Sequence, residues 1–349
     1  NPQHPYYNCW NRNKKSATIN LSTEAGKEAA RQLAGKCDII IENFSAGVLA
    51  RWGLDHATLS PSHPELSVIS MAGMGNSGPW KDFVTFAPTI HALTGLTWAT
   101  NYSGNHDLGM GYSMCDHLSG LAAALGAFEV LSHRARTGKG LCIDLSQYEI
   151  GLGMMATSYL DFFANGHAFE AQGNKHPYRE CAPHGIYPCE GLDRWVAIAI
   201  ENDEQWKELC ILMDKKEISS TPRFHNLENR LKNQHEIDET IASWTSTQDR
   251  YAIMELCQKK GIPAGVVQDG ADIGTNDPQL QARGFFQRIE SETLGNHLAD
   301  VFPARFNERS PNPAQGAHAL GSDTLEIFTN IVGLQAEKVA DLITEGILS

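Results

Sequence analysis

The segment at residues 111–147, GYSMCDHLSGLAAALGAFEVLSHRARTGKGLCIDLSQ, constrains the fold more than any other part of the chain. It begins with small residues that lead to Asp116 and continues as a run rich in alanine and leucine. The basic turn RARTGKG then leads into a short apolar run at 141–145. The first run predicts a helix that ends near Gly138, and the second predicts a buried strand.

Two more apolar runs, at 37–42 (CDIIIE) and 66–72 (LSVISMA), also predict buried strands. Residues 11–21 indicate a basic loop that runs into a short strand. The following segment predicts a helix over 23–36, with Ser22 or Thr23 as its N-cap and Gly35 as its stop. Strands that alternate with helices predict an α/β fold with a parallel sheet.

Residues 173–189, GNKHPYRECAPHGIYPC, break this periodicity and predict a crossing between two domains. The large domain is expected to span 1–172 and to be completed by the C-terminal residues 312–349. A smaller α/β domain is expected at 190–276, where strand patterns flank several helical ones, and 277–311 is expected to be the return linker.

The composition excludes several classes of protein. A formal net charge of −13 argues against a nucleic-acid partner. No uninterrupted apolar run approaches the roughly 20 residues that span a membrane, and no signal peptide is visible, so we expect a cytoplasmic protein without a membrane partner. The eight cysteines are scattered without a C-x-x-C pair, which predicts reduced thiols and no metal site.

Asp116 has two interpretations from the sequence alone. An aspartate at the start of a helix can cap free backbone N–H groups. It can also be a reactive carboxylate, since Gly111, Ser119 and Gly120 would allow a ligand to come close. The neighbouring Cys115 is interpreted as a small buried thiol, with a nucleophilic role as the alternative.

The whole segment resembles the central signature of the type III CoA-transferases. That signature combines a glycine, an aspartate followed by Ser/Thr-Gly, an alanine-rich helix, R-x-R-T-G-x-G and an apolar strand. The resemblance implies that Asp116 is the catalytic residue. A second segment, NFSAGVLARWG at 43–53, resembles the family's N-F-x-P-G-x-x-x-R-x-G motif, with Ala46 in place of proline. By resemblance the residues that bind coenzyme A are Ile19, Asn43, Phe44, Val48 and Arg51. Arg136 and Lys139 are weaker candidates, because basic side chains are also favoured at the C-terminal end of a helix, where their charge complements the helix dipole.

The resemblance implies a large Rossmann-like domain with a parallel sheet, a smaller α/β domain and an interlocked homodimer whose arms are the two linkers. It also implies an enzyme that moves CoA from an acyl-CoA to a small carboxylic acid, through an aspartyl anhydride and an aspartyl-CoA thioester, without a metal. Three features depart from the family. The strand–helix unit that precedes the matching region has no counterpart before Asn1, a tetraglycine loop is missing, and the Lys, Tyr and Glu of formyl-CoA transferase fall on Thr85, Ala87 and Pro88.

Other functions stay open at this point. An acyl-CoA racemase of the same superfamily would tend to carry G-H-D-x-N-Y where this chain has KDFVTFAP, and a non-catalytic CoA-binding subunit would not need Asp116. Gly73, Gly75 and Gly78 have the spacing of a dinucleotide fingerprint, but Pro79 follows and the expected acidic residue is absent. His176 and His184 could act as acid–base groups, although loop histidines are more often structural.

Overall fold

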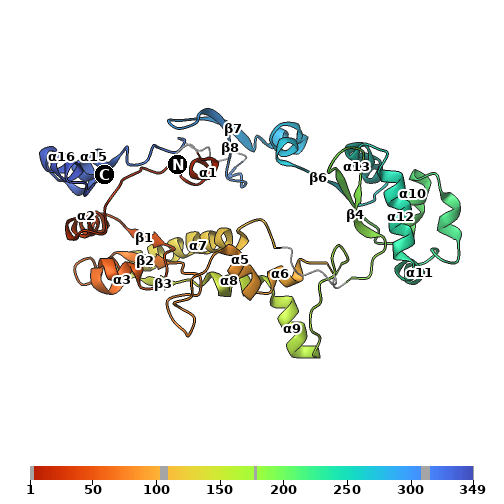
Figure 1. Ribbon diagram of the computed structural model, residues 1–349, viewed down its shortest axis with the longest axis horizontal. Helices are drawn as coiled ribbons and strands as arrows, with labels where there is room; N and C mark the ends of the chain where they lie inside the picture. The colour runs from red at the N-terminus through yellow and green to blue at the C-terminus, as the bar shows by residue number, and fades with distance from the viewer. Residues whose placement is uncertain (1–3, 103–108, 177–178, 308–314, 349) are drawn as a thin grey trace. The chain divides into compact units, whose positions relative to one another are not determined.

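The computed structural model describes residues 4–102, 109–176, 179–307 and 315–348 (Figure 1). By its internal contacts the chain divides into two units. The large unit comprises Asn1–Leu96, Gly109–Ala168 and Pro278–Ser349, and the small unit comprises Thr97–Leu108 and Phe169–Asp277. The large unit is therefore built from both ends of the chain, and it also includes most of the segment expected to be the return linker.

A three-stranded parallel sheet lies in the large unit, in the order β1 (Ile39–Glu42), β2 (Ser67–Ser70) and β3 (Cys142–Asp144). All three strands fall within the runs from which they were predicted. The central strand β2 is buried along its whole length. Val68 and Ile69 are buried on opposite faces of this strand, so both faces of the sheet are covered here, which is why the strand's sequence does not alternate between apolar and polar residues.

The strand expected within residues 11–21 does not form. The backbone of this segment instead bonds to the C-terminal part of the chain. The N–H of Asn20 donates to the carbonyl of Ile347 at 2.8 Å, and the N–H of Thr18 donates to Oγ1 of Thr324 at 3.1 Å. These two backbone N–H groups are thus satisfied by residues about 300 positions away, and no local sequence pattern predicts such a contact.

The predicted helix α2 (Glu24–Ala34) has the expected ends, because Thr23 Oγ1 accepts from Gly26 N–H at 3.0 Å and Gly35 is the C-cap. After β3 the chain forms two helices, α8 (Gln147–Met154) and α9 (Ala156–Asn165), with a break at Met155. The remaining elements of the large unit are α1 (Pro5–Trp10), α3 (Val48–Trp52), α4 (His56–Leu59), α5 (Ala87–Leu93), α14 (Pro278–Arg283), the hairpin β7 (Phe286–Ser291) and β8 (Gly295–Asp300), α15 (Thr324–Glu326), η3 (Ile327–Val332) and α16 (Ala336–Thr344). The short helix α6 (Leu96–Ala99) lies where the two units meet in sequence.

The longest helix is α7 (Met114–Thr137), which ends at Gly138 in the left-handed conformation. It packs against β2, α5 and α8 (Figure 1). The turn that follows needs Gly140, because a Cβ there would lie 2.1 Å from the carbonyl oxygen of Leu66. Among the described residues α7 is the one helix that is long and apolar enough to cross a membrane by length and composition, although it contains no uninterrupted apolar run of that length, and 22% of its apolar window is buried.

The small unit contains an antiparallel sheet in the order β4 (His184–Pro188), β5 (Trp195–Ala199) and β6 (Ala264–Val267). Its core gathers Val196, Trp206 and Ile241 between this sheet and the helices. The strand β4 lies inside the segment expected to be an irregular crossing, and its pairing with β5 gives it regular structure. The other elements are α10 (Asp203–Leu212), η1 (Lys216–Ser220), α11 (Leu227–Lys232), α12 (Gln234–Thr245), α13 (Arg250–Lys259) and η2 (Asp272–Asn276).

The buried carboxylate of Asp323 ties the C-terminal segment to the beginning of the chain, and we expect it to make stability depend on pH. The N–H of Ser16 donates to it at 2.7 Å and the ring of His318 lies 2.9 Å away. The Ser16 hydrogen bond, supported by His318, holds the pKa of Asp323 below its usual value. Replacing Asp323 with Asn should lower the free energy of unfolding by about 1–3 kcal/mol at pH 7.

A group whose pKa is lowered by folding stabilises the protein above its unfolded pKa and loses that contribution as the pH falls. The difference between wild type and Asp323→Asn should therefore shrink as the pH falls below about 4. Urea unfolding of both proteins at several pH values measures this difference in the free energy of unfolding. A difference that stays constant from pH 7 to pH 3 would contradict this account.

Candidate active site

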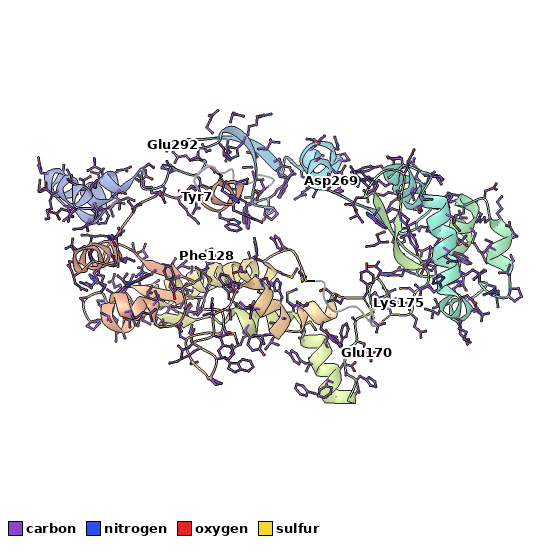
Figure 2. The ribbon with its side chains drawn as sticks, in the orientation of Figure 1. Tyr7, Phe128, Glu170, Lys175, Asp269 and Glu292 are labelled. Carbon is purple, nitrogen blue, oxygen red and sulfur yellow. The ribbon has the colours of Figure 1, made fainter. Side chains whose placement is uncertain are left out.

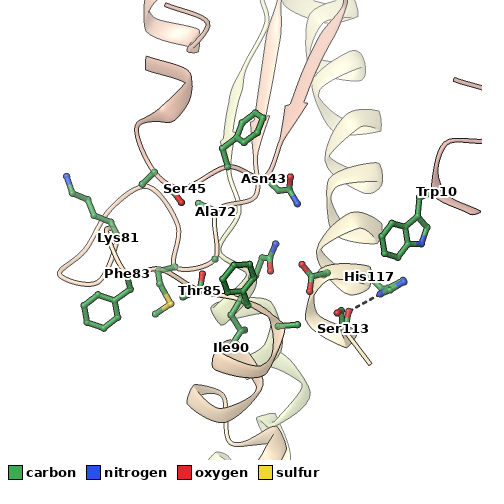
Figure 3. Close-up of a pocket in the computed structure, with 18 residues that line it drawn as sticks. Trp10, Asn43, Ser45, Ala72, Lys81, Phe83, Thr85, Ile90, Ser113 and His117 are labelled. Atoms are coloured by element: carbon green, nitrogen blue, oxygen red, sulfur yellow. Dashed lines mark hydrogen bonds between the residues drawn. The ribbon is translucent and has the colours of Figure 1, made fainter. Parts of the chain in front are cut away.

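A cavity of about 560 Å³ opens in the large unit where the strands of the parallel sheet end (Figure 3). Its wall includes residues 43–46 after β1, residues 72–74 after β2, the start of α7 and the first residue of α8. The carboxyl ends of parallel strands are where ligands bind in open α/β sheets. The volume is in the range of small-molecule sites.

Asp116 lines this cavity as the third residue of α7. The helix begins at Met114 and its N-cap is Ser113, so Asp116 is not the N-cap that the capping interpretation requires. Within the described part of the chain, no hydrogen bond is formed by its carboxylate, and no other carboxylate lines the cavity. Asp116 is half-buried, and its charge lies in the first turn of a helix, where the helix dipole favours an anion.

The first turn of α7 is held by a side chain from α5. Ser113 makes no capping bond with its side chain, and the N–H of Cys115 instead donates to Nε2 of His91 at 3.4 Å. His91 is only 1% exposed. A backbone N–H can only donate, so Nε2 is the unprotonated nitrogen and the ring proton lies on Nδ1, which is buried without a hydrogen-bond partner among the described residues.

Cys115 is fully buried beside this contact, as the sequence predicted. Burial, and then the charge of Asp116, raises the pKa of its thiol. A thiol with a raised pKa carries little thiolate, which is the nucleophilic form. The burial of Cys115 agrees with the buried-thiol interpretation.

Two of the residues expected to bind coenzyme A, Asn43 and Phe44, line the cavity. Asn43 is labelled in Figure 3. The N–H of Phe44 donates to Oε2 of Glu42 at 2.6 Å, and its ring packs edge-on against Trp52 at 5.1 Å. Val48 begins α3, and Arg51 is exposed on the same helix. Ile19 is partly buried against the apolar cores of the large unit and does not line the cavity.

Arg136 and Lys139 lie at the other end of α7. Arg136 lies 20 positions after Asp116 on this helix, which corresponds to about 30 Å along the axis. Arg136 lies 3.7 Å from Glu129, and both side chains are exposed. The structure therefore does not bring these two cations to the cavity.

Sequence reasoning did not identify several residues of the wall. His117 lines it, with its Nδ1–H donating to the carbonyl of Ser113 at 2.8 Å and its ring stacked on Tyr112 at 4.5 Å. Trp10 from α1 packs edge-on against the same ring at 6.0 Å. Gln147 comes three positions after the end of β3, and the rule that ligands gather at strand ends could have found it.

The remaining candidate sites are not supported. After Gly78 the chain forms turns and the next helix begins only at Ala87, so the helix that a dinucleotide fingerprint needs is missing. His176 and His184 belong to the small unit, where their rings lie 6.1 Å apart.

Of the three residues that correspond to the Lys, Tyr and Glu of formyl-CoA transferase, Thr85 and Ala87 line the cavity, whereas Pro88 does not. Within the described residues no group of His, Cys, Asp and Glu could hold a metal ion.

Comparisons with known proteins give the family of the chain. The sequence model described as CoA-transferase family III matches residues 1–324. The chain belongs to CoA-transferase family III. Its enzyme class is therefore CoA-transferase.

Several relatives match over most of this family III chain. The succinyl-CoA–D-citramalate CoA-transferase of Chloroflexus aurantiacus is 31% identical over 95% of this chain and 81% of its own length. The formyl-CoA:oxalate CoA-transferase of Bradyrhizobium diazoefficiens is 26% identical over 99% of this chain and 84% of its own. The crystal structure of a CAIB/BAIF family protein from Brucella suis superposes with a TM-score of 0.85, at 28% identity, over 93% of this chain and 84% of that one.

We predict that His91 stabilises the start of α7 through its acceptor nitrogen. Replacing His91 with Leu leaves the N–H of Cys115 buried without a partner, which should lower the free energy of unfolding by about 1–3 kcal/mol. Replacing it with Gln provides an amide oxygen as acceptor and should recover at least half of that loss. Urea unfolding of the three proteins measures the difference, and equal losses in both variants would argue against the contact.

Proposed function

We propose that this protein transfers CoA from an acyl-CoA to a small carboxylic acid, with Asp116 as the covalent nucleophile. The observation that carries the proposal is the position of Asp116. It is the sole carboxylate among the described residues that line the cavity, and the described part of the chain forms no hydrogen bond to it. A carboxylate is already ionised at neutral pH and can attack without a general base.

The reaction has two symmetrical halves. In the first, an oxygen of Asp116 attacks the thioester carbonyl, the C–S bond breaks, and CoA thiolate leaves. The thiolate then attacks the Asp116 carbonyl of the resulting anhydride, so that the donor acid leaves and CoA is bound to Asp116 as a thioester. The acceptor carboxylate repeats these two steps in reverse. No net proton transfer is needed, which agrees with a cavity whose only ionisable groups among the described residues are Lys81, Asp116 and His117.

The relatives and the cavity support a proposal for the substrate class. The named relatives act on citramalate and oxalate, which are small organic acids. We propose an acceptor of the same class for this chain. Lys81 places one positive charge in the cavity wall, where it can attract an anionic group of a substrate although the chain as a whole carries a net charge of −13.

We propose that coenzyme A lies along residues 43–51, with Asn43 and Phe44 at the cavity and Val48, Arg51 and Ile19 farther along the same face. Arg51 is exposed and so is available for a phosphate contact. The share of Arg51, Arg136 and Lys139 in binding can be measured from the CoA affinity of their alanine variants. An affinity that depends on Arg136 and Lys139 but not on Arg51 would reverse the proposed direction of the cofactor. We also expect the enzyme to act in the cytoplasm, where its eight free cysteines would stay reduced.

An isotope experiment tests the aspartyl route. Each turnover should leave one oxygen of the acceptor carboxylate on Asp116 and pass it to the donor acid that is released in the next turnover. With an acceptor labelled with ¹⁸O in its carboxylate, the released donor acid should therefore gain ¹⁸O over successive turnovers, measured by mass spectrometry. Active transfer without label in the donor acid would contradict the route, and a racemase would release no donor acid at all.

We propose that the enzyme is a homodimer in which α7 forms part of the interface, with residues 173–189 and 277–311 as connecting arms. One face of α7 exposes Leu121, Leu125 and Phe128, at fractions of 66%, 72% and 75%. These residues are three or four positions apart and so form one row on the helix, and Phe128 is labelled in Figure 2. An apolar row of this kind on a single chain indicates a protein interface.

The dimer predicts that a charge in this row prevents association. Replacing Phe128 with Lys should shift the protein from dimer to monomer in sedimentation velocity at micromolar concentration. Replacing the exposed Lys139, at the end of the same helix, with Glu is a matched control and should leave the dimer intact. A Phe128→Lys protein that remains dimeric would exclude this face as the interface.

A further inference from the structure

Gln147 is a buried polar residue in the wall of the cavity. It is the first residue of α8, three positions after the end of β3, and it is 6% exposed. Its side-chain Nε2 donates to the carbonyl of Met71 at 3.2 Å, and its backbone N–H donates to the carbonyl of Ala72 at 3.3 Å. Both acceptors follow β2, so the residue is attached to the end of the central strand.

The bond to Met71 fixes the orientation of the amide. A carbonyl oxygen can only accept, so the nitrogen of the amide and not its oxygen faces Met71. An amide nitrogen carries two hydrogens, and this contact uses one. No described residue hydrogen-bonds to the rest of the amide, although the side chain is more than nine-tenths buried and borders the cavity that holds Asp116. The contact with Met71 thus leaves one amide N–H and the amide oxygen for a ligand in the cavity.

A structural role alone does not account for this arrangement. The start of α8 is already attached to the segment after β2 by two backbone hydrogen bonds, from the N–H of Gln147 to Ala72 and from the N–H of Tyr148 to Gly73. The side chain of Gln147 is therefore not needed for this attachment. The second N–H is therefore available for chemistry in the cavity.

We propose that Gln147 is a catalytic residue whose free amide N–H binds the carbonyl oxygen of the acyl-CoA thioester. This inference rests on the proposed function. As the bond from Asp116 oxygen to the carbonyl carbon forms, the π electron pair of the carbonyl moves onto its oxygen, and the Gln147 N–H donates a hydrogen bond to that oxyanion. The amide keeps its proton. When the C–S bond breaks, the pair returns to the carbonyl and thiolate leaves.

A neutral donor suits this position. A fixed positive charge beside Asp116 would stabilise its carboxylate before the attack and so weaken it as a nucleophile. An amide dipole that is held in place by Met71 interacts most strongly with the charge that develops on the carbonyl oxygen during the reaction. Removal of one such donor from an enzyme lowers kcat by about 100- to 1000-fold.

The test compares Gln147→Met and Gln147→Glu in the full-length enzyme. Methionine has a similar length but no donor, so kcat for CoA transfer should fall about 100-fold while KM for the acyl-CoA stays within about threefold. Glutamate has the same shape but presents a carboxylate to the oxyanion, so its kcat should fall further. The matched control is Gln234→Met. Gln234 is also a buried glutamine, but it belongs to the small unit, so this variant should keep the wild-type kcat.

Two results would overturn the role of Gln147. One is a kcat for Gln147→Met within about threefold of wild type. The other is an equal fall in kcat in Gln147→Met and Gln147→Glu, accompanied by a similar loss of CoA affinity. That result is expected if Gln147 only attaches α8 to the end of β2. A wild type that never forms a hydroxylamine-sensitive adduct on Asp116 would instead overturn the proposed function, and the role of Gln147 with it.

Discussion

The site depends on how the first turn of α7 is held. A helix leaves its first backbone N–H groups without partners inside the helix, and in α7 the side chain of Ser113 does not satisfy them. The ring of His91 reaches across from α5 and accepts the N–H of Cys115. Asp116 follows one residue later, so its position is set by a contact between two helices and not by a hydrogen bond to its own carboxylate. The carboxylate is thus left without a hydrogen-bond partner among the described residues, as the proposed nucleophile requires.

The rest of the site follows from the sheet. Three parallel strands end at the same edge, and each delivers one part of the wall, residues 43–46, residues 72–74 and Gln147. Asn43 and Gln147 supply amide groups and Asp116 supplies the charge, while α7 and α8 are packed against each other and hold their first turns in place. This arrangement of two amides and one carboxylate agrees with a covalent mechanism. In such a mechanism the protein must fix two reacting atoms and stabilise a transient negative charge.

Local patterns predicted the elements that depend on local interactions. The strands β1, β2 and β3, the caps of α2 and the stop at Gly138 were all found, because apolar runs and capping residues act within a few positions. Elements that depend on distant partners were missed. The backbone of residues 16–20 bonds to the C-terminal helices, and β4, whose sequence HGIYP contains glycine and proline, becomes a strand through its pairing with β5. The same limit applies to the site. Asp116, Asn43 and Phe44, expected from the resemblance to a family, line the cavity. Gln147 could have been expected from its place after a strand end, whereas the contact of His91 with α7 joins residues 24 positions apart and no local pattern predicts it.

The most direct test of the account is the Asp116→Asn variant. Asparagine has the shape of aspartate but cannot form an anhydride, so the variant should fold, bind CoA and lose CoA transfer by several orders of magnitude. Wild type incubated with acyl-CoA and then hydroxylamine should carry a hydroxamate on the peptide that contains Asp116, detected by mass spectrometry, and the variant should not. Full transferase activity in Asp116→Asn, together with an unmodified Asp116 peptide in wild type, would contradict the account.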